Sequence, residues 1–255
     1  MIEERIDKIN ENLALIQRRG GLTFGTDAYL LSAFVRPNPN GVCCELGGGC
    51  GVIPLLCMSR GKYRHFFTAE IQEVYADVIR RNAILNGMED KITVLCDDVR
   101  CLTPVMLGGE ADAVLSNPPY MTKDSGKTND NDEMSIARRE LNGTIRDFCA
   151  AASRLLKFGG LFYVVYRPDR MAELFAAMEN ANLEPKRMIT VYPSVDDKPC
   201  LILVEAKKGA KPSLIQAPPL IIYADSEKQV YTADMDRVYE HCSLEFMFDK
   251  GKGGV

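Results

Sequence analysis

The 255-residue chain contains no tryptophan, only two histidines and no long apolar run. No apolar stretch approaches the roughly 18 residues that a membrane-spanning helix needs, and the acidic start lacks the basic region of a signal peptide. We therefore expect a cytoplasmic protein that does not contact a membrane. His65 and His241 lie far apart in the sequence, with no carboxylate cluster at ligand spacing. This scarcity argues against a metal site and against a Ser-His-Asp catalytic device.

Disulfide and zinc-ribbon patterns are also missing. The chain has nine cysteines, an odd number, and no two of them form a C-x-x-C pair, which favours reduced and mostly buried thiols. Neither sign of charge dominates, because 31 Lys and Arg face 35 Asp and Glu, for a net charge of −4. This balance excludes a protein that wraps nucleic acid over most of its surface, but it permits a local basic patch.

The sequence does contain a regular alternation of short apolar strands and amphipathic helices. Such βαβ units build parallel sheets, and the last two strands are close enough to pair antiparallel. We therefore expect an α/β fold with one wound sheet of seven strands, mostly parallel, with the last strand antiparallel. The expected strands are residues 42–46, 65–69, 92–95, 111–115, 161–166, 187–192 and 200–205, and the expected helices are residues 53–60, 73–85, 141–156 and 171–180.

Two small extensions flank this core, which we place at residues 41–208. Residues 1–40 are expected to pack on the core, with a short amphipathic helix over 6–16, then extended chain, then a second helix up to residue 34 that Thr26 or Asp27 caps. Residues 209–255 are expected to form an appendage within the same globular unit. This appendage has its own order, including a helix capped near Thr232.

A glycine-rich turn joins the first core strand to the next helix. Glycines there let a ligand touch the backbone, and the helix N-terminus faces it. The dinucleotide fingerprint G-x-G-x-x-G is not matched, since its third glycine would fall on Val52 or Pro54, and NAD is therefore disfavoured. The motif E-L-G-G-G-C-G supplies Glu45, Gly47, Gly49 and Gly51.

Acidic residues end the next two strands. Glu70 follows the second strand, 25 residues after Glu45, where a carboxylate could accept both ribose hydroxyls of a nucleoside. Asp97 and Asp98 follow the third strand, and either could contact the base or cap a turn. These positions indicate a nucleoside-binding crevice.

The sequence N-P-P-Y directly follows the apolar strand over 111–115. An amine or amide nitrogen is a weak nucleophile because its lone pair is delocalised, and acceptors aimed at its hydrogens can hold that lone pair toward an electrophile. Asn117 offers its side-chain oxygen and Pro118 its carbonyl, while Tyr120 offers a ring for stacking. No general base is then required. The predicted catalytic residues are Asn117, Pro118, Pro119 and Tyr120.

Taken together, these motifs resemble class I S-adenosylmethionine methyltransferases that carry (N/D)PP(Y/F) and modify adenine N6, guanine N2 or glutamine amide nitrogen. The segments Phe24 to Leu31, 137–140 and Leu220 to Tyr223 are similar to bacterial tRNA adenine-N6 methyltransferases that act on A37 of valine tRNA. Residue 139 departs from that family, with arginine where histidine is common. The resemblance implies a Rossmann-like fold, S-adenosylmethionine as cofactor and tRNA as partner. It implies Glu45, Gly47, Gly49, Gly51, Glu70, Asp98 and Asn117 as cofactor-binding residues.

Alternatives remain open at this point. One is a glutamine methyltransferase of release factors, although only 44 residues precede Glu45 where that family has a helical substrate domain. Others are adenine-N6 or guanine-N2 methylation of another RNA, and a non-catalytic nucleotide-binding RNA chaperone. The loop over 123–132 could order over a substrate or stay solvated, and the oligomeric state is open. Candidate phosphate contacts are Arg138, Arg139, Lys186, Arg187, Lys207, Lys208 and Lys211. Of these, Arg138, Arg139, Lys207, Lys208 and Lys211, with the loop from Lys123, are expected to form a small cationic rim.

Overall fold

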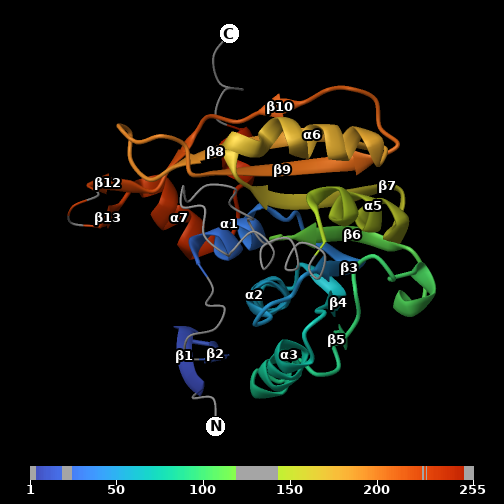
Figure 1. Cartoon of the computed structure of the whole chain (residues 1–255). Coiled ribbons are helices and arrows are strands. Elements are labelled where there is room, and N and C mark those ends of the chain that lie inside the picture. Colours follow the sequence, from blue (N-terminus) through green and yellow to red (C-terminus); the bar gives the residue numbers. More distant parts are fainter. Residues whose placement is uncertain (1–3, 19–24, 119–142, 226, 228, 250–255) are drawn as a thin grey trace, which may run out of the picture.

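A large, mostly parallel sheet runs through the molecule (Figure 1). The computed structural model describes residues 4–18, 25–118, 143–225, 227 and 229–249. Seven strands form the core of the sheet, in the order β8-β9-β7-β6-β3-β4-β5, and β9 runs antiparallel to both of its neighbours. The predicted seven-stranded sheet is confirmed. Its strands are β3 (Asn38–Leu46), β4 (Tyr63–Ala69), β5 (Ile92–Leu95), β6 (Ala111–Ser116), β7 (Leu156–Tyr166), β8 (Leu183–Tyr192) and β9 (Leu201–Lys208).

Helices cover both faces of the sheet and bury it in two apolar clusters. Side chains of α1 and α2 pack in one cluster with the N-terminal hairpin and the C-terminal helix, and side chains of α5 and α6 pack in the other. The boundaries expected at 73–85 and 171–180 agree with the structure. The helix expected over 141–156 starts later in the described chain, because Thr144 caps it, and residue 141 lies outside the described residues. The helices are α1 (Thr26–Phe34), α2 (Val52–Ser59), α3 (Glu73–Leu85), α5 (Ile145–Leu155), α6 (Met171–Asn180) and α7 (Ala233–His241), with short 3-10 helices at Pro104–Leu107, Pro168–Arg170 and Glu245–Phe248.

The helix expected over residues 6–16 is wrong. This segment forms an antiparallel hairpin of β1 (Glu4–Asn10) and β2 (Leu13–Arg18). Burial alternates along β2, as expected for a strand with one face on the core. The backbone N–H groups of Ala14 and Ile16 donate to Asn86 Oδ1 (3.1 Å) and Asn82 Oδ1 (2.7 Å) on α3. These long-range bonds favour the extended conformation over the local helical spacing.

The C-terminal segment does more than form an appendage. Its β10 (Ile215–Gln216) and β11 (Leu220–Ile221) both pair in parallel with β8 and widen the main sheet to nine strands. Beyond them, β12 (Tyr223–Asp225) and β13 (Val230–Tyr231) form a separate antiparallel pair. The Thr232 side chain caps α7 as predicted. No helix in the described part of the chain is long and apolar enough to cross a membrane.

Candidate active site

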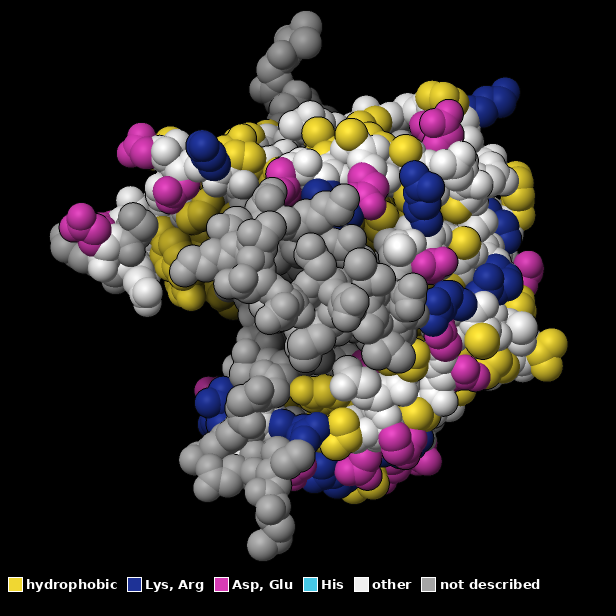
Figure 2. All heavy atoms as spheres, in the orientation of Figure 1, with side chains coloured by type: hydrophobic (Ala, Val, Ile, Leu, Met, Phe, Trp, Pro, Cys, Tyr) yellow, Lys and Arg dark blue, Asp and Glu magenta, His cyan; other side chains and the backbone are white. Residues whose placement is uncertain are grey.

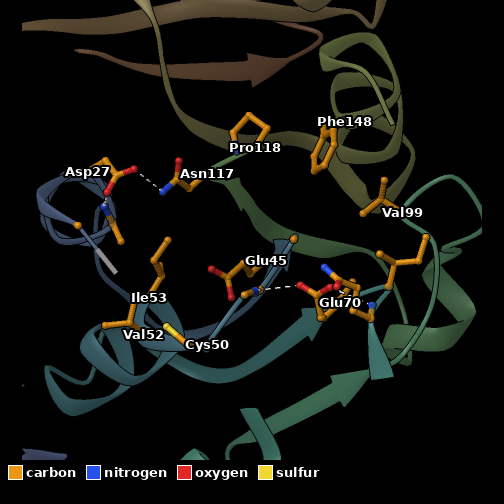
Figure 3. A pocket seen from close by; sticks show the side chains of 18 of the residues that line it. Asp27, Glu45, Cys50, Val52, Ile53, Glu70, Val99, Asn117, Pro118 and Phe148 are labelled. Atoms are coloured by element: carbon orange, nitrogen blue, oxygen red, sulfur yellow. Dashed lines mark hydrogen bonds between the residues drawn. The ribbon is translucent and has the colours of Figure 1, made fainter. Parts of the chain in front are cut away.

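A cavity of about 450 Å³ opens at the carboxyl edge of the parallel strands (Figure 3). Loops following β3, β4, β5 and β6 line it, together with the start of α1 and one face of α5. Wound sheets bind ligands at this edge, and the volume lies within the usual range for small-molecule sites. The cavity brings together seven of the residues singled out from the sequence: Glu45, Gly47, Gly49, Glu70, Asp98, Asn117 and Pro118.

Three other predicted site residues are not among the described residues that line the cavity. Gly51 is not among the lining residues; it caps α2 with a φ of +79°, a left-handed conformation that favours glycine. Pro119 and Tyr120 lie outside the described residues. Of the two acids after β5, Asp98 lines the cavity and Asp97 does not. Asp98 is bound by Arg100 (Nη2 to Oδ2, 2.5 Å), and this hydrogen bond lowers the pKa of its carboxyl group.

Backbone contacts hold the glycine turn tightly against β4. The N–H groups of Gly47 and Gly48 both donate to the Ala69 carbonyl, at 2.9 and 3.0 Å. A Cβ at Gly48 would lie 2.2 Å from Thr68 Cγ2 and 2.8 Å from Ile79 Cδ1, closer than real Cβ atoms approach. The turn therefore needs glycine at this position, because it packs directly against side chains of β4 and α3.

Two buried carboxyl groups form the floor of the cavity. Glu45 is 1% exposed and Glu70 is 5% exposed. Glu70 Oε2 accepts the Gly49 N–H (3.0 Å), and its Oε1 accepts the Gln72 N–H (2.9 Å). Among the described residues, no partner hydrogen-bonds to Glu45 Oε2. This oxygen and the Thr68 hydroxyl, which acts on the pKa of Glu45, are both fully buried, and a buried oxygen without a partner is costly.

Burial raises the pKa of both carboxyl groups above their ordinary value. For Glu45 the increase is large, and the nearby Glu70 charge adds to it; for Glu70 the backbone hydrogen bonds partly oppose it. Each group therefore binds a proton more tightly in the folded state than in the unfolded chain. The two carboxylates together oppose folding at neutral pH unless a ligand compensates.

The ligand-free protein should lose stability as the pH rises from about 4.5 toward the raised pKa values. In this window the folded state holds more protons than the unfolded chain, so the free energy of unfolding falls with increasing pH. Replacing Glu45 with glutamine should flatten the slope by up to about 1.4 kcal/mol per pH unit, because one titrating carboxyl group is removed. Urea denaturation between pH 4.5 and 8 measures it. Glu89→Gln, at an exposed site, is the control and should keep the wild-type slope; an unchanged slope in Glu45→Gln contradicts the prediction.

Asp27 and Phe148 are lining residues that sequence reasoning did not assign to the site. Asn117 Nδ2 donates to Asp27 Oδ2 (2.9 Å), and Figure 3 shows the two side chains pointing toward one another. The sequence suggested Asp27 only as a helix cap, but Gly25 is the N-cap of α1. The Phe148 ring lies next to Gly47, where a Cβ would approach it to 3.6 Å. The sequence feature that could have indicated Asp27 is its position within Phe24 to Leu31, the segment that resembles tRNA adenine-N6 methyltransferases.

The candidate phosphate contacts do not form one rim around this cavity. Lys207 pairs with Leu161 and Lys208 with Leu183, near the amino ends of β7 and β8. Because β9 is antiparallel, its last residues lie at the amino edge of the parallel strands. The cavity lies at the opposite, carboxyl edge. Arg138 and Arg139 lie outside the described residues. On the face in Figure 2, basic and acidic side chains are interspersed.

Two of these basic residues, Arg187 and Lys208, form ion pairs or hydrogen bonds with other groups of the protein. Arg187 pairs with Glu205 (3.2 Å) and Glu245 (2.9 Å). Lys208 Nζ donates to the Leu156 carbonyl at 2.6 Å. These contacts stabilise the far edge of the sheet. In the part of the chain that the structure describes, no three His, Cys, Asp or Glu side chains are grouped to hold a metal ion.

Several known proteins are similar to this chain in sequence, and several solved structures are similar to it in fold. The methyltransferase small domain family matches residues 19–186, well over half of the chain. A protein of Porphyromonas gingivalis named tRNA1(Val) (adenine(37)-N6)-methyltransferase is 27% identical over 187 residues, covering 71% of this chain and 72% of that protein. A protein with the same name from a Flavobacteriaceae bacterium is 22% identical and covers 88% of this chain and 89% of its own length.

Solved structures agree on the fold. A predicted O-methyltransferase from Agrobacterium tumefaciens has a TM-score of 0.68 at 22% identity, covering 86% of this chain and 97% of that one. A geranyl diphosphate C-methyltransferase from Streptomyces coelicolor has a TM-score of 0.52 at 14% identity, covering 72% of this chain and 78% of that one. The family match runs from the start of α1 through the glycine turn and Asn117, so the chain belongs to the methyltransferase small domain family and is an S-adenosylmethionine-dependent methyltransferase.

Proposed function

We propose that this enzyme methylates the exocyclic N6 amine of an adenine in tRNA, and that the adenine is A37 in the anticodon loop of a valine tRNA. The observation that carries the proposal is Asn117, an amide held at the edge of a nucleoside-sized cavity at the end of β6. The names of the relatives from Porphyromonas gingivalis and the Flavobacteriaceae support the choice of tRNA. Both cover most of their own length in the match.

The residues present fit S-adenosylmethionine. Glu70 would accept the ribose hydroxyls, because each of its oxygens accepts a single backbone N–H in the structure and keeps further lone-pair capacity. Asp98 would accept the adenine amino group at the end of β5, and the glycine turn would contact the amino acid part through its backbone. When bound, this cofactor supplies an electrophilic methyl group on a sulfonium sulfur.

The chemistry then needs acceptors and no metal. Asn117 Oδ1 and the Pro118 carbonyl would accept the two hydrogens of the adenine amine and turn its lone pair toward the methyl group. The amine needs no deprotonation before transfer, and its proton leaves to solvent afterwards. Tyr120, predicted from the sequence to stack on the target base, completes the proposal. The base must leave its stack to reach the cavity, which is easiest in a loop such as the anticodon loop.

The test uses purified protein, radiolabelled S-adenosylmethionine and two transcripts of valine tRNA, one with A37 and one with G37. We expect N6-methyladenosine, identified by nucleoside mass spectrometry, in the A37 transcript and none in the G37 transcript. Equal methylation of both would contradict the position but keep adenine in tRNA as substrate.

Release factor is incubated in parallel. Methylated glutamine in release factor, with no methylated adenine, would replace the proposal with the protein-methylating alternative. If neither substrate is methylated while the cofactor binds, methylation of another RNA becomes the favoured alternative. A cytosolic location, where tRNA and release factors are found, stays a prediction.

A further inference from the structure

Asp27 holds the Asn117 side chain from a distant part of the chain. The two residues are 90 positions apart, yet Asn117 Nδ2 donates to Asp27 Oδ2 at 2.9 Å. Asp27 lies in the first turn of α1, and its other oxygen, Oδ1, accepts the Ala28 N–H at 2.9 Å. Figure 3 shows this pair beside the cavity that Glu45 and Glu70 line. The helix therefore fixes the carboxylate, and the carboxylate contacts the amide.

The local sequence leaves room for this carboxylate. A Cβ at Gly25 would lie 2.8 Å from Asp27 Oδ1, so a larger residue there would displace the side chain. The rest of α1 is anchored in the core, since Leu30 and Leu31 are fully buried. The hydroxyl of Tyr29 also donates to the Tyr239 carbonyl of α7, at 2.9 Å. Asp27 is therefore presented by a rigid element, which suits a residue that orients another.

The chemistry of the pair decides which way the amide faces. A carboxylate only accepts hydrogen bonds, whereas an amide has an oxygen that accepts and a nitrogen that donates. Opposite Asp27 the nitrogen is the favoured end, which leaves Oδ1 on the other side of the amide. In the flipped arrangement, Nδ2 would face an incoming amine with hydrogens against hydrogens. A residue that cannot donate is thus suited to keep Asn117 in its accepting orientation.

We propose that Asp27 is a positioning residue for methyl transfer, which holds the Asn117 amide with Oδ1 toward the amine of the target and so selects a base that presents N–H donors. This inference rests on the proposed function, in which Oδ1 accepts from that amine. By this role, Asp27 on α1 contributes to the preference for adenine over a base that has an oxygen in place of the amine. Hypoxanthine, the base of inosine, is such a base.

The first test compares Asp27→Asn with the wild type. An asparagine can turn either end toward Asn117, and the remaining bond is no longer charge-assisted. We expect kcat to fall about 5- to 20-fold, with KM for tRNA and the affinity for S-adenosylmethionine within about twofold of wild type. Asp236→Asn is the matched control, because it removes the same charge from the first turn of α7; it should keep wild-type kinetics. An unchanged kcat in Asp27→Asn overturns the proposal.

An exchange variant separates orientation from general damage. Combining Asp27→Asn with Asn117→Asp restores a pair of one amide and one carboxylate, with an acceptor oxygen left for the amine. We expect its kcat to exceed that of Asp27→Asn by at least about threefold. If the exchange variant is slower than Asp27→Asn, although both melt within a few degrees of wild type, restoring an amide–carboxylate pair does not restore the orientation of the acceptor and the proposal is wrong.

The second test reads the selection of the base directly. A valine tRNA with inosine at position 37 presents an oxygen where adenine has its amine, so it should inhibit the wild type weakly. In Asp27→Asn the amide can turn its nitrogen toward that oxygen, and the ratio of inosine to adenine affinity should rise about fivefold. An unchanged ratio contradicts the proposed selection.

Failure of the proposed function would look different from failure of this inference. If the wild type methylates glutamine in release factor and not adenine, the tRNA proposal falls. The kcat comparison is then made on the glutamine amide, which presents the same N–H donors. If the wild type methylates A37 and Asp27→Asn does so equally fast, only the role of Asp27 is wrong.

Discussion

Replacing Asn117 with alanine is expected to lower kcat for methyl transfer by at least about a hundredfold, the scale for losing one preorganised contact made in the transition state. The alanine cannot accept from the target amine, whose lone pair then stays delocalised into the ring. The effect should be visible in single-turnover experiments with saturating S-adenosylmethionine, in which binding and product release do not limit the rate. Near-normal turnover would exclude the mechanism proposed for N-P-P-Y.

The fold should survive this change. Asn117 follows β6, whose strand contacts with β3 and β7 end at Ser116. A matched control is Asn180→Ala at the exposed end of α6, far from the cavity in sequence and not among its lining residues. Both variants should melt close to the wild type, and Asn180→Ala should retain full turnover. A large decrease in melting temperature for Asn117→Ala alone would assign the residue to stability instead.

The sheet was predictable because its strands carry their own signal. Parallel strands that are covered on both faces are nearly continuous apolar runs. The sequence shows such runs, without alternating charged residues, at Phe162 to Tyr166 and at Val114 to Leu115. The site residues at strand ends were predictable for a related reason. Glu70 and Asn117 directly follow such strands and Glu45 is the penultimate residue of β3, and the carboxyl ends of adjacent parallel strands meet at one edge.

Long-range contacts account for what the sequence did not reveal. The spacing of Ile6, Ile9 and Leu13 fits a helix. The pairing of β1 with β2, and the hydrogen bonds of β2 to the side chains of Asn82 and Asn86, favour the strand. The contact of Asp27 with Asn117 joins residues that no local pattern connects. In each case the deciding hydrogen bond spans more than 60 residues.

Strand direction explains the misplaced cationic rim. Lysines near the end of the last strand would lie at the cavity if that strand ran parallel to the others. The antiparallel β9 was expected, but its consequence for Lys207 and Lys208 depends on where it sits, between β7 and β8. The register of Lys207 with Leu161 then fixes it at the amino edge. Lys207 and Lys208 therefore lie away from the cavity.

Replacing Glu70 with alanine is expected to weaken S-adenosylmethionine binding by about 1.5–3 kcal/mol, because two ribose hydroxyls would lose a charged acceptor. This loss corresponds to a Kd about 10- to 150-fold higher, measurable by calorimetry. Glu73→Gln is the matched control: it lies three residues away on α3, its side chain is 71% exposed, and it should bind as the wild type does.

The pH dependence of S-adenosylmethionine binding tests the same role of Glu70, and the environment of Glu70 determines the direction of the change. Burial raises the pKa of Glu70, and a protonated carboxyl group accepts hydroxyl donors poorly. Affinity should therefore fall as the pH decreases through this raised pKa, since binding the hydroxyls requires the proton to leave first. The isosteric Glu70→Gln variant should bind weakly with a flat profile over the same range. A wild-type affinity in Glu70→Ala, or a pH profile that Glu70→Gln leaves unchanged, removes Glu70 from the ribose site and leaves only its bonds to Gly49 and Gln72 as its role.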